Sequence, residues 1–590
     1  MTCWHLICTN HDDDHAEEAS FTFQVWIGTM ISFFLCASIL LIVLSSSSDA
    51  FAVVLSRPWA ISPRPVASAL AASAPSSNLP AEADVVVIGS GLAGLSCAAL
   101  LSHCQKSVVV LESHDAPGGA AHTWERRGFH FESGPSLYSG LSSDRSPNPL
   151  KNIFQIVGED CQWITYDRWG TVLPNGDKFA AKIGPEEFED VLLKQGGPEA
   201  QAEFAKLMDR MKPLSDAAQA LTSLALREDS GAILTLLKYP RELLTTLGQG
   251  QQLNEPFSQI MKEMNVKNEF VKNWLDMLCF LLQGLPADGT MNAVMAYMLA
   301  DWYRPGVTLD YPKGGSGAIV DALVRAVRKH AQSNVYMNCH VDQILVQNGK
   351  AAGVKLQDGR TVMARTAVVS NADPFMTYQF LSQAHKDGRL PPAMEQELNQ
   401  MINTDTTNGG TRNLASFIHI HAGIDAEGLP SEASADFPAQ WAVIRDWNAQ
   451  PGGVEAPRNV ALVSMPSLID PSMAPPGKHV IHAYTPATEP YEWWEGLDRN
   501  SDEYKQKKEE AADFLWSAIE EYIPNARHRT VPGTVQIGTP LTHERFLRRA
   551  RGSYGPRVNV GSGQTLPGHK ISALPGFYRT VRSRDRLFSV

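Results

Sequence analysis

The sequence predicts an α/β protein with a Rossmann-type dinucleotide-binding domain and a second domain made of a mixed β-sheet and helices. Three observations support this prediction. A short β-branched run enters a glycine-rich turn and a helical pattern follows it. A second apolar run then ends at an acidic residue, near the spacing of about 20 residues that ribose binding requires. Farther along the chain, strand patterns alternate with loops.

The composition is that of a globular protein. The 590 residues are 44% hydrophobic and 19% charged, which provides apolar material for a large core and excludes disorder over most of the chain. The formal net charge is −12 and no basic run occurs, so nucleic acid is not an expected partner. The eight cysteines are irregularly spaced and form neither a disulfide framework nor a zinc pattern. Cys3 and Cys8 have the spacing of a flavin disulfide reductase, but they precede everything that can fold.

Residues 1–80 are predicted to be a targeting leader. Residues 21–48 carry no charge and are long enough to span a bilayer, so residues 24–44 could anchor the chain in an endomembrane. Acidic residues precede them, whereas the n-region of a signal peptide is basic. Translation from Met30 instead of Met1 would leave a short apolar segment that is typical of a signal peptide.

The second part of the leader has the composition of a transit peptide. The signal-like segment ends at Ala50, and residues 51–80 contain Arg57, Arg64, many Ser and Ala residues and no acid. This order resembles the two-part leader of algal plastids that have extra envelope membranes. The predicted location is therefore the plastid (chloroplast), and the leader is excluded from the fold.

The glycine-rich turn has the context that a dinucleotide site requires. Residues 85–88 (VVVI) predict a buried parallel strand. The turn that follows is Gly89-Ser90-Gly91-Leu92-Ala93-Gly94, and LSCAALLSHC then has helical spacing. Residues 108–111 predict the next strand, which ends at Glu112.

Each part of this unit has a physical reason. Gly89 permits the tight turn, Gly91 lets the backbone approach a pyrophosphate, and Gly94 lets helix and strand pack closely. The phosphates would lie at the helix N-terminus, where free N–H groups and the helix dipole favour negative charge. Glu112 is the candidate acid for the ribose hydroxyls.

The residues beyond Glu112 indicate which dinucleotide binds. Gly118 and Gly119 follow it closely, and residues 128–134 (GFHFESG) predict a strand and a turn. With these segments the sequence resembles the flavin amine oxidase and phytoene desaturase superfamily, in which the glycine doublet lets the backbone pass close to FAD. The resemblance implies a GR2-like FAD-binding domain with FAD as the cofactor. A pyridine-nucleotide disulfide reductase would usually carry a second GxGxxG and an internal cysteine pair, and neither is found.

The rest of the chain fits an FAD domain that is interrupted twice. The predicted segments are FAD-binding parts at 84–175, 305–374 and 535–590, a helical substrate or membrane region at 176–304, and a substrate domain at 375–534. Turns at Asn348-Gly349 and Asp358-Gly359 separate short strands in the second FAD-binding part. The resemblance implies that the backbone of Val341 pairs with the adenine.

Several other side chains allow two interpretations. Strand alternation places His419 and His421 on one face, as metal ligands would be, and His479 and His482 lie in another strand pattern. No nearby Asp, Glu or Cys set completes a site, so strand packing is favoured and no metal is predicted. Trp493-Trp494 could be a membrane-interface contact or part of the core or a loop. The apolar residues of the helical region could belong to the core or line a substrate site: Trp274, Met277, Leu278 and Phe280 to Leu282.

Further segments narrow the resemblance to the carotenoid isomerase and phytoene-desaturase-like branch: residues 117–122, 131–136, 311–319, 537–547 and 552–556. The activity that this implies is cis–trans isomerisation of a poly-cis carotene. The flavin would transiently lower the order of one double bond, while the protein supplies an apolar tunnel. A lipophilic polyene and a membrane surface are the implied partners, and no electron partner is identified. No catalytic residue is assigned. Glu132 and His130 are candidate acids near the flavin, with structural support of the turn as the alternative.

Other functions remain open at this point. A carotenoid desaturase and a retinol-saturase-like reductase use the same scaffold, and an amine oxidase is a more distant alternative. The superfamily continues after a segment like Gly576-Phe577-Tyr578-Arg579 into a Gly-Asp pair, a Pro-Gly turn and a helix under the flavin. Here TVRSRDRLFSV follows instead. The third FAD-binding part is therefore expected to be truncated, which makes a flavin-free binding protein a further alternative.

Overall fold

The computed structural model describes residues 78–580, apart from gaps at 135–136, 144–145, 147, 222–248, 397–412, 556, 558–559 and 561–572. Nearly all of the predicted leader, including the candidate anchor at residues 24–44, lies outside the described residues. The segment after Thr580, on which the expected truncation depends, lies outside them as well. Within the described part of the chain, no helix has both the length and the apolar character needed to cross a bilayer.

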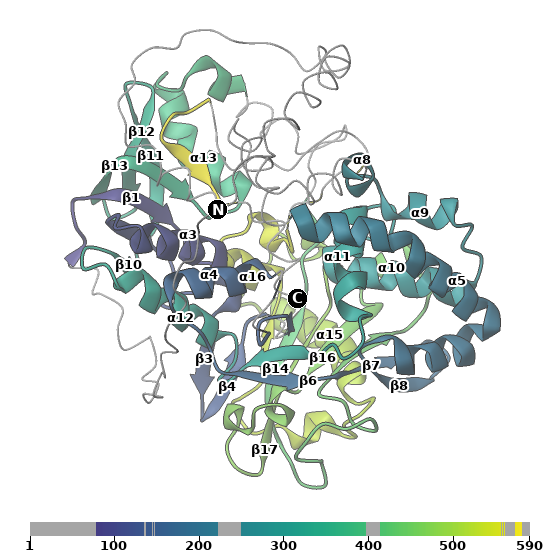
Figure 1. Ribbon diagram of the computed structural model, residues 1–590. Coiled ribbons are helices and arrows are strands. Elements are labelled where there is room, and N and C mark those ends of the chain that lie inside the picture. The colour runs from purple at the N-terminus through teal and green to yellow at the C-terminus, as the bar shows by residue number, and fades with distance from the viewer. Residues whose placement is uncertain are drawn as a thin grey trace, which may run out of the picture. The chain divides into compact units, whose positions relative to one another are not determined.

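The first sheet contains the predicted dinucleotide-binding core (Figure 1). Its strands within the described residues are β1 (Glu82–Ile88), β2 (Val108–Leu111), β10 (Asn334–Tyr336), β11 (Val341–Gln347), β12 (Lys350–Leu356), β13 (Thr361–Ser370) and β19 (Phe577–Arg579). Their order is β10-β2-β1-β13-β12-β11, and β19 pairs with the carboxyl end of β13. The strands β10, β2, β1, β13 and β19 run parallel, whereas β11 and β12 form the antiparallel hairpins that the turn residues predicted.

Helices cover both faces of this sheet. They are α3 (Leu92–His103), α12 (Gly317–Arg328) and α13 (Pro374–Lys386). Val85 and Val87 of β1 belong to the core cluster that contains α3 and α12. Val86 and Ile88 belong to the cluster that contains α13. Because side chains alternate along a strand, burial of both faces explains why β1 reads as a continuous apolar run.

A second, mixed sheet has the order β18-β14-β17-β16-β15-β7-β8. Its strands are β7 (Arg168–Val172), β8 (Lys178–Lys182), β14 (His419–Asp425), β15 (Gln440–Ile444), β16 (Val460–Ser464), β17 (Lys478–Tyr484) and β18 (Gln536–Gly538). All described pairs are antiparallel except β7 with β15. The segment boundaries expected at 175/176 and 534/535 therefore cut across this sheet. Local alternation shows that a strand exists, but it does not show which sheet the strand joins.

Helices pack on this second sheet as well. One face contacts α15 (Asp502–Ile519), and the other contacts the helical region through residues such as Ala442 and Leu462. The described helices of that region are α5 (Pro185–Leu221), α8 (Gly250–Leu253), α9 (Phe257–Glu263), α10 (Glu269–Gln283) and α11 (Asn292–Trp302). Trp274, Met277 and Leu278 lie in this core and also line a small apolar cavity. Of the tryptophan pair, Trp494 is fully buried whereas Trp493 is exposed.

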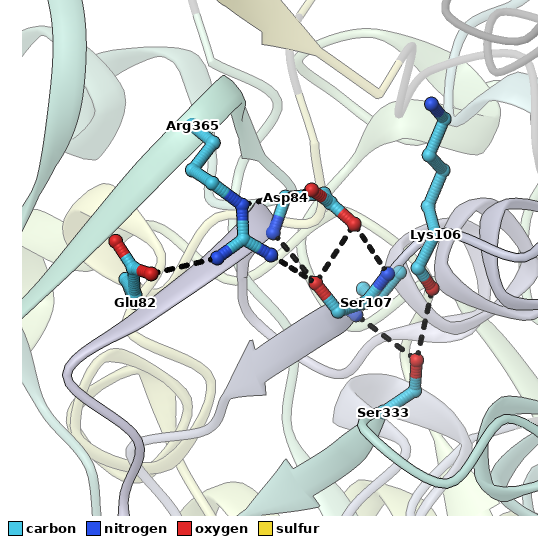
Figure 2. Close-up of polar contacts among 7 residues, drawn as sticks. Glu82, Asp84, Lys106, Ser107, Ser333 and Arg365 are labelled. Carbon is cyan, nitrogen blue, oxygen red and sulfur yellow. Dashed lines mark hydrogen bonds and ion pairs between the residues drawn. The ribbon is translucent and has the colours of Figure 1, made fainter.

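A polar cluster ties the strands of the first sheet together near the starts of β1 and β2 (Figure 2). The Asp84 carboxylate accepts hydrogen bonds from Ser107 N and Oγ, both at 2.8 Å, and from Arg365 Nε at 3.0 Å. Ser333 Oγ accepts from Val108 N and donates to Lys106 O. Partial burial raises the pKa of Asp84, but the hydrogen bonds from Ser107 and Arg365 outweigh burial, so this pKa lies below its usual value. The glycine-rich turn lies at the opposite end of these strands, after the carboxyl end of β1.

Candidate FAD site and substrate pocket

The glycine-rich turn lies between the carboxyl end of β1 and the first turn of α3. Gly89 has a left-handed backbone, with φ 89°. A Cβ on Gly94 would lie 2.4 Å from Gly89 O, and a Cβ on Gly91 would lie 2.7 Å from Asn371 Nδ2. Gly91 is the N-cap of α3 and offers no side-chain cap, so the N–H groups of the first helical turn remain for an anion. The backbone thus forms a cradle that any larger side chain would fill.

The carboxylate at the end of β2 is fixed beside this turn. Ser90 N and Oγ donate to Glu112 Oε2 at 2.8 and 2.6 Å. Glu112 Oε1 accepts from His114 N at 2.9 Å. Ser90 is fully buried and Glu112 is 8% exposed, so the carboxylate presents only an edge to the pocket. A carboxylate held in this way can accept a hydrogen bond from a ribose hydroxyl.

The glycine doublet contacts the turn backbone to backbone. Gly118 N donates to Ser90 O at 3.0 Å, and Gly118 forms a parallel bridge with Gly91. A Cβ on Gly119 would lie 3.1 Å from Gly91 Cα. Both doublet residues have positive φ angles, 117° and 60°. The two glycine segments therefore form one surface, as their resemblance to an FAD site implied.

The predicted cofactor residues come together in one pocket. Its lining includes Gly89, Gly91, Leu92, Ala93, Glu112, Gly118, Gly119 and Val341. Ser90 and Gly94 lie behind this surface, where they hold Glu112 and pack α3 against β1. Asn371 and Asp373 also line the pocket but were not among the predicted site residues. Their position just after β13, which pairs with β1, is the signal that could have identified them, because ligands bind at the carboxyl ends of parallel strands.

The candidate acids differ in their surroundings. Glu132 ends β4 (Phe129–Glu132) and is 3% exposed. Its carboxylate accepts from Tyr311 OH at 2.8 Å and from Ser316 N and Oγ at 2.6 and 2.9 Å. Ser316 is the N-cap residue of α12, so Glu132 binds the start of that helix. His130 is half-buried and is not among the described lining residues of the pocket. These contacts favour the structural interpretation of Glu132.

Beyond the glycine turn, the pocket is lined by rings. They belong to Tyr138, Phe417, His482, Tyr484 and Tyr554. Further histidines lie behind them, and Phe417 stacks on one of these rings, His543, with 3.6 Å between ring centroids. Burial lowers the pKa of His482 well below its usual value and that of His543 to about 3, so both imidazoles are uncharged at neutral pH. These uncharged rings suit an apolar conjugated ligand, and the pocket is also lined by Arg548 and Arg549.

Comparison with known proteins connects this geometry to a family. The model of the flavin containing amine oxidoreductases matches residues 92–406, more than half of the chain. The chain belongs to this family. The matched range contains Glu112, the glycine doublet, Val341 and Asn371. FAD is therefore the cofactor, and the glycine cradle and the carboxylate at the end of β2 fit it.

Individual relatives extend the match. Prolycopene isomerase from Daucus carota is 29% identical over 503 residues, which are 84% of this chain and 76% of the carrot protein. All-trans-retinol 13,14-reductase from Danio rerio is 27% identical over 511 residues, covering 81% of this chain and 78% of that protein. An oxidoreductase from Methanosarcina mazei superposes with a TM-score of 0.53 at 19% identity, covering 84% of this chain and 93% of that one. The predicted carotenoid isomerase-like branch and the α/β FAD-binding fold are confirmed.

Proposed function

We propose that the chain is an FAD-dependent cis–trans isomerase of a long polyene, similar to prolycopene isomerases. The coarser assignment, an FAD oxidoreductase of a carotenoid- and retinoid-related family, follows from the family match and from the relatives. The observation that supports the finer one is the likeness to a prolycopene isomerase over 84% of this chain. The uncharged ring-lined part of the pocket, beside the cofactor cradle, is compatible with such a substrate.

In the proposed reaction, some residues of the chain bind the cofactor and others exclude water from the substrate. FAD supplies reversible electron or hydride exchange when it is bound. The first turn of α3 and Glu112 would hold its charged and hydroxyl groups at one end of the pocket. The other end of the pocket is lined by the rings of Phe417, Tyr484 and Tyr554. A polyene can pack on the apolar faces of these rings, and no hydrogen bond to water is lost because neither surface makes one. The proposed reaction uses no side-chain nucleophile.

The experiment supplies poly-cis lycopene to the full-length, FAD-loaded protein and analyses the product by mass spectrometry and absorption. Isomerisation gives a product of unchanged mass and altered absorption spectrum. Glu112→Ala is the cofactor-deficient comparison, and Asp115→Asn is its matched control, because the side chain of Asp115 is 77% exposed and lies outside the pocket lining. Activity that is lost in the first variant and kept in the second supports the proposal. An FAD-loaded wild-type protein that leaves the double-bond geometry of lycopene unchanged would contradict the proposed isomerase function.

A reductase is the second candidate function, because the zebrafish retinol reductase covers nearly as much of the chain as the carrot isomerase does. The same assay distinguishes the two. With the bound flavin reduced beforehand, a product two mass units heavier indicates saturation of one double bond, and with the flavin oxidised, a product two units lighter indicates desaturation. A protein that takes up no flavin but binds the polyene without changing it would support the flavin-free binding alternative.

The proposal extends to location. A carotene dissolves in lipid, so we propose a plastid protein whose pocket opens toward a membrane surface in a monotopic contact. The chloroplastic relatives support the plastid. Residues 1–80 fused to a fluorescent protein should direct it to plastids, and the mature chain should float with plastid-lipid liposomes. A fusion retained in the endoplasmic reticulum would favour the anchor alternative, and a chain that stays with the soluble fraction would exclude the membrane contact.

A further inference from the structure

We propose that His419, His421 and His482 bind one divalent transition-metal ion of the zinc class beside the ring-lined part of the pocket. These three residues are called the histidine cluster below. The inference goes beyond the proposed function and does not depend on it, because it concerns three histidines of which only His482 lines the pocket, and it is tested without any polyene.

Strand pairing fixes the cluster. His419 and His421 alternate along β14 and therefore share a face of the second sheet. The neighbouring strand β17 runs antiparallel, and its His482 lies directly opposite His421. The ring centroids of His421 and His482 are 4.2 Å apart, and those of His419 and His421 are 4.6 Å apart. One ring nitrogen of each residue lies within 4.8 Å of the other two.

Two buried ring nitrogens of the cluster lack hydrogen-bond partners among the described residues, which points to a bound metal ion. The three side chains are buried, with exposed fractions of 8% for His419, 1% for His421 and 6% for His482. Among the described residues, neither His419 Nδ1 nor His482 Nε2 has a hydrogen-bond partner. Buried polar atoms are nearly always paired, and a bound ion is one of the few explanations when they are not. The sequence pattern favoured histidines that only pack within their strands, and these two unpaired atoms differ from that expectation.

The third histidine is oriented as metal-binding histidines usually are. His421 Nε2 lies 2.7 Å from Glu132 O, so this nitrogen carries the proton and donates to the carbonyl. The other ring nitrogen then keeps its lone pair. A second-shell carbonyl that fixes the tautomer in this way is the common partner of a metal-ligating imidazole. The groups around the cluster are mainly rings: Trp124, Phe417, Tyr484 and His543.

The donor set selects the class of ion. Neutral imidazoles suit Zn²⁺, Co²⁺ and related ions rather than Mg²⁺ or Ca²⁺, which prefer oxygen. Zn–N bonds of about 2.0–2.1 Å in a tetrahedral site place ligand nitrogens roughly 3.3 Å apart, so the stacked rings of His421 and His482 must turn toward a common point. Three protein ligands leave a fourth position open. Because His482 lines the pocket whereas His419 and His421 do not, the pocket is the side from which a water molecule would reach that position.

The test uses Co²⁺ and Zn²⁺ with the full-length, FAD-loaded protein, purified without a polyhistidine tag. We expect one equivalent of either ion by elemental analysis after gel filtration, and a Co²⁺ ligand-field band at wavelengths longer than the flavin bands. His482→Gln should weaken Co²⁺ binding about a hundredfold or more. His479→Gln is the matched control: it is also a buried histidine of β17, but its Nδ1 pairs with Ser467 Oγ at 3.0 Å. This control should bind Co²⁺ as the wild type does.

Two results would overturn the inference. One is a wild-type protein that takes up neither ion stoichiometrically, which decides the matter without any variant. The other is a His482→Gln protein that binds Co²⁺ as tightly as the wild type, which places the ion elsewhere. The flavin spectrum reports whether each variant is folded, and His419→Gln replaces His482→Gln if the latter loses its flavin. Metal uptake by a chain that fails to isomerise lycopene would contradict only the proposed function.

Discussion

Replacement of Gly94 by alanine tests the contact between α3 and β1 on which the cofactor turn depends. An added Cβ would lie 2.4 Å from Gly89 O and 3.0 Å from Asn371 Cβ. Both neighbours are held by the central strands, because Asn371 N donates to Ile88 O at 2.8 Å and Gly89 N donates to Leu111 O at 2.8 Å. A carbon–oxygen contact requires about 3.3 Å. The start of α3 must therefore move away from β1 by roughly 1 Å.

Two opposing effects set the magnitude. Overpacking of a tight interior contact costs about 1–3 kcal/mol, and the cost should lie in the upper part of this range because the obstructing atom is a backbone oxygen. Alanine gains at most about 1 kcal/mol over glycine from helix propensity. The free energy of unfolding should therefore fall by about 1–2 kcal/mol. Displacement of the N–H groups of α3 should also weaken FAD binding about tenfold. This factor corresponds to a loss of about 1.4 kcal/mol of binding free energy.

The measurements are urea unfolding of the FAD-free protein and a flavin fluorescence titration. Gly555→Ala is the matched control, because a Cβ at Gly555 would meet no atom of the described residues within 4 Å and no left-handed backbone is present there. It should leave FAD affinity unchanged. A Gly94→Ala protein that is as stable as the wild type or more so, and binds FAD equally well, would refute the reasoning. Helix propensity would then outweigh the contact, and the turn would be looser than the structure indicates.

Three further predictions concern separate parts of the molecule. Glu112→Ala removes the acceptor of two Ser90 donors and should weaken FAD binding by about ten- to a hundredfold in the same titration, whereas Asp115→Asn should not change it. Trp274→Ala should lower the free energy of unfolding by about 3–5 kcal/mol, and Trp493→Ala, at an exposed position, by less than about 1 kcal/mol. The lowered pKa of Asp84 means that its carboxylate stabilises the fold above the unfolded pKa of about 3.9, and that this contribution is lost as the pH falls through the folded pKa. Asp84→Asn should therefore be less stable at neutral pH and lose less stability than the wild type between about pH 4 and pH 2; equal losses would contradict the assignment.

The features that could be predicted from the sequence are those set by local pattern. A β-branched run, a glycine turn and a terminal acid determine β1, the start of α3 and Glu112, because each residue acts on neighbours close in the chain. Strand membership could not be predicted in the same way. β7 and β8 lie far in sequence from β15, yet β7 pairs with it in parallel, and that pairing follows from packing between distant segments. The histidine cluster has the same origin: alternation places His419 and His421 together, but only the register with β17 adds His482.

The short strand β4 explains why the cofactor cradle and the ring-lined wall, though remote in sequence, form one pocket. The Glu132 side chain binds Tyr311 and the start of α12, which packs against α3, while its backbone oxygen binds His421 in the second sheet. Phe129, at the other end of β4, lies so close to Gly423 of β14 that a Cβ there would be 2.5 Å from its ring. One strand of four residues therefore links a helix that covers the first sheet to a strand of the second sheet, through hydrogen bonds and a close packing contact. A change in β4 should alter flavin binding and the ring-lined wall together, and for this reason the burial of Glu132 is better explained by positioning than by proton transfer.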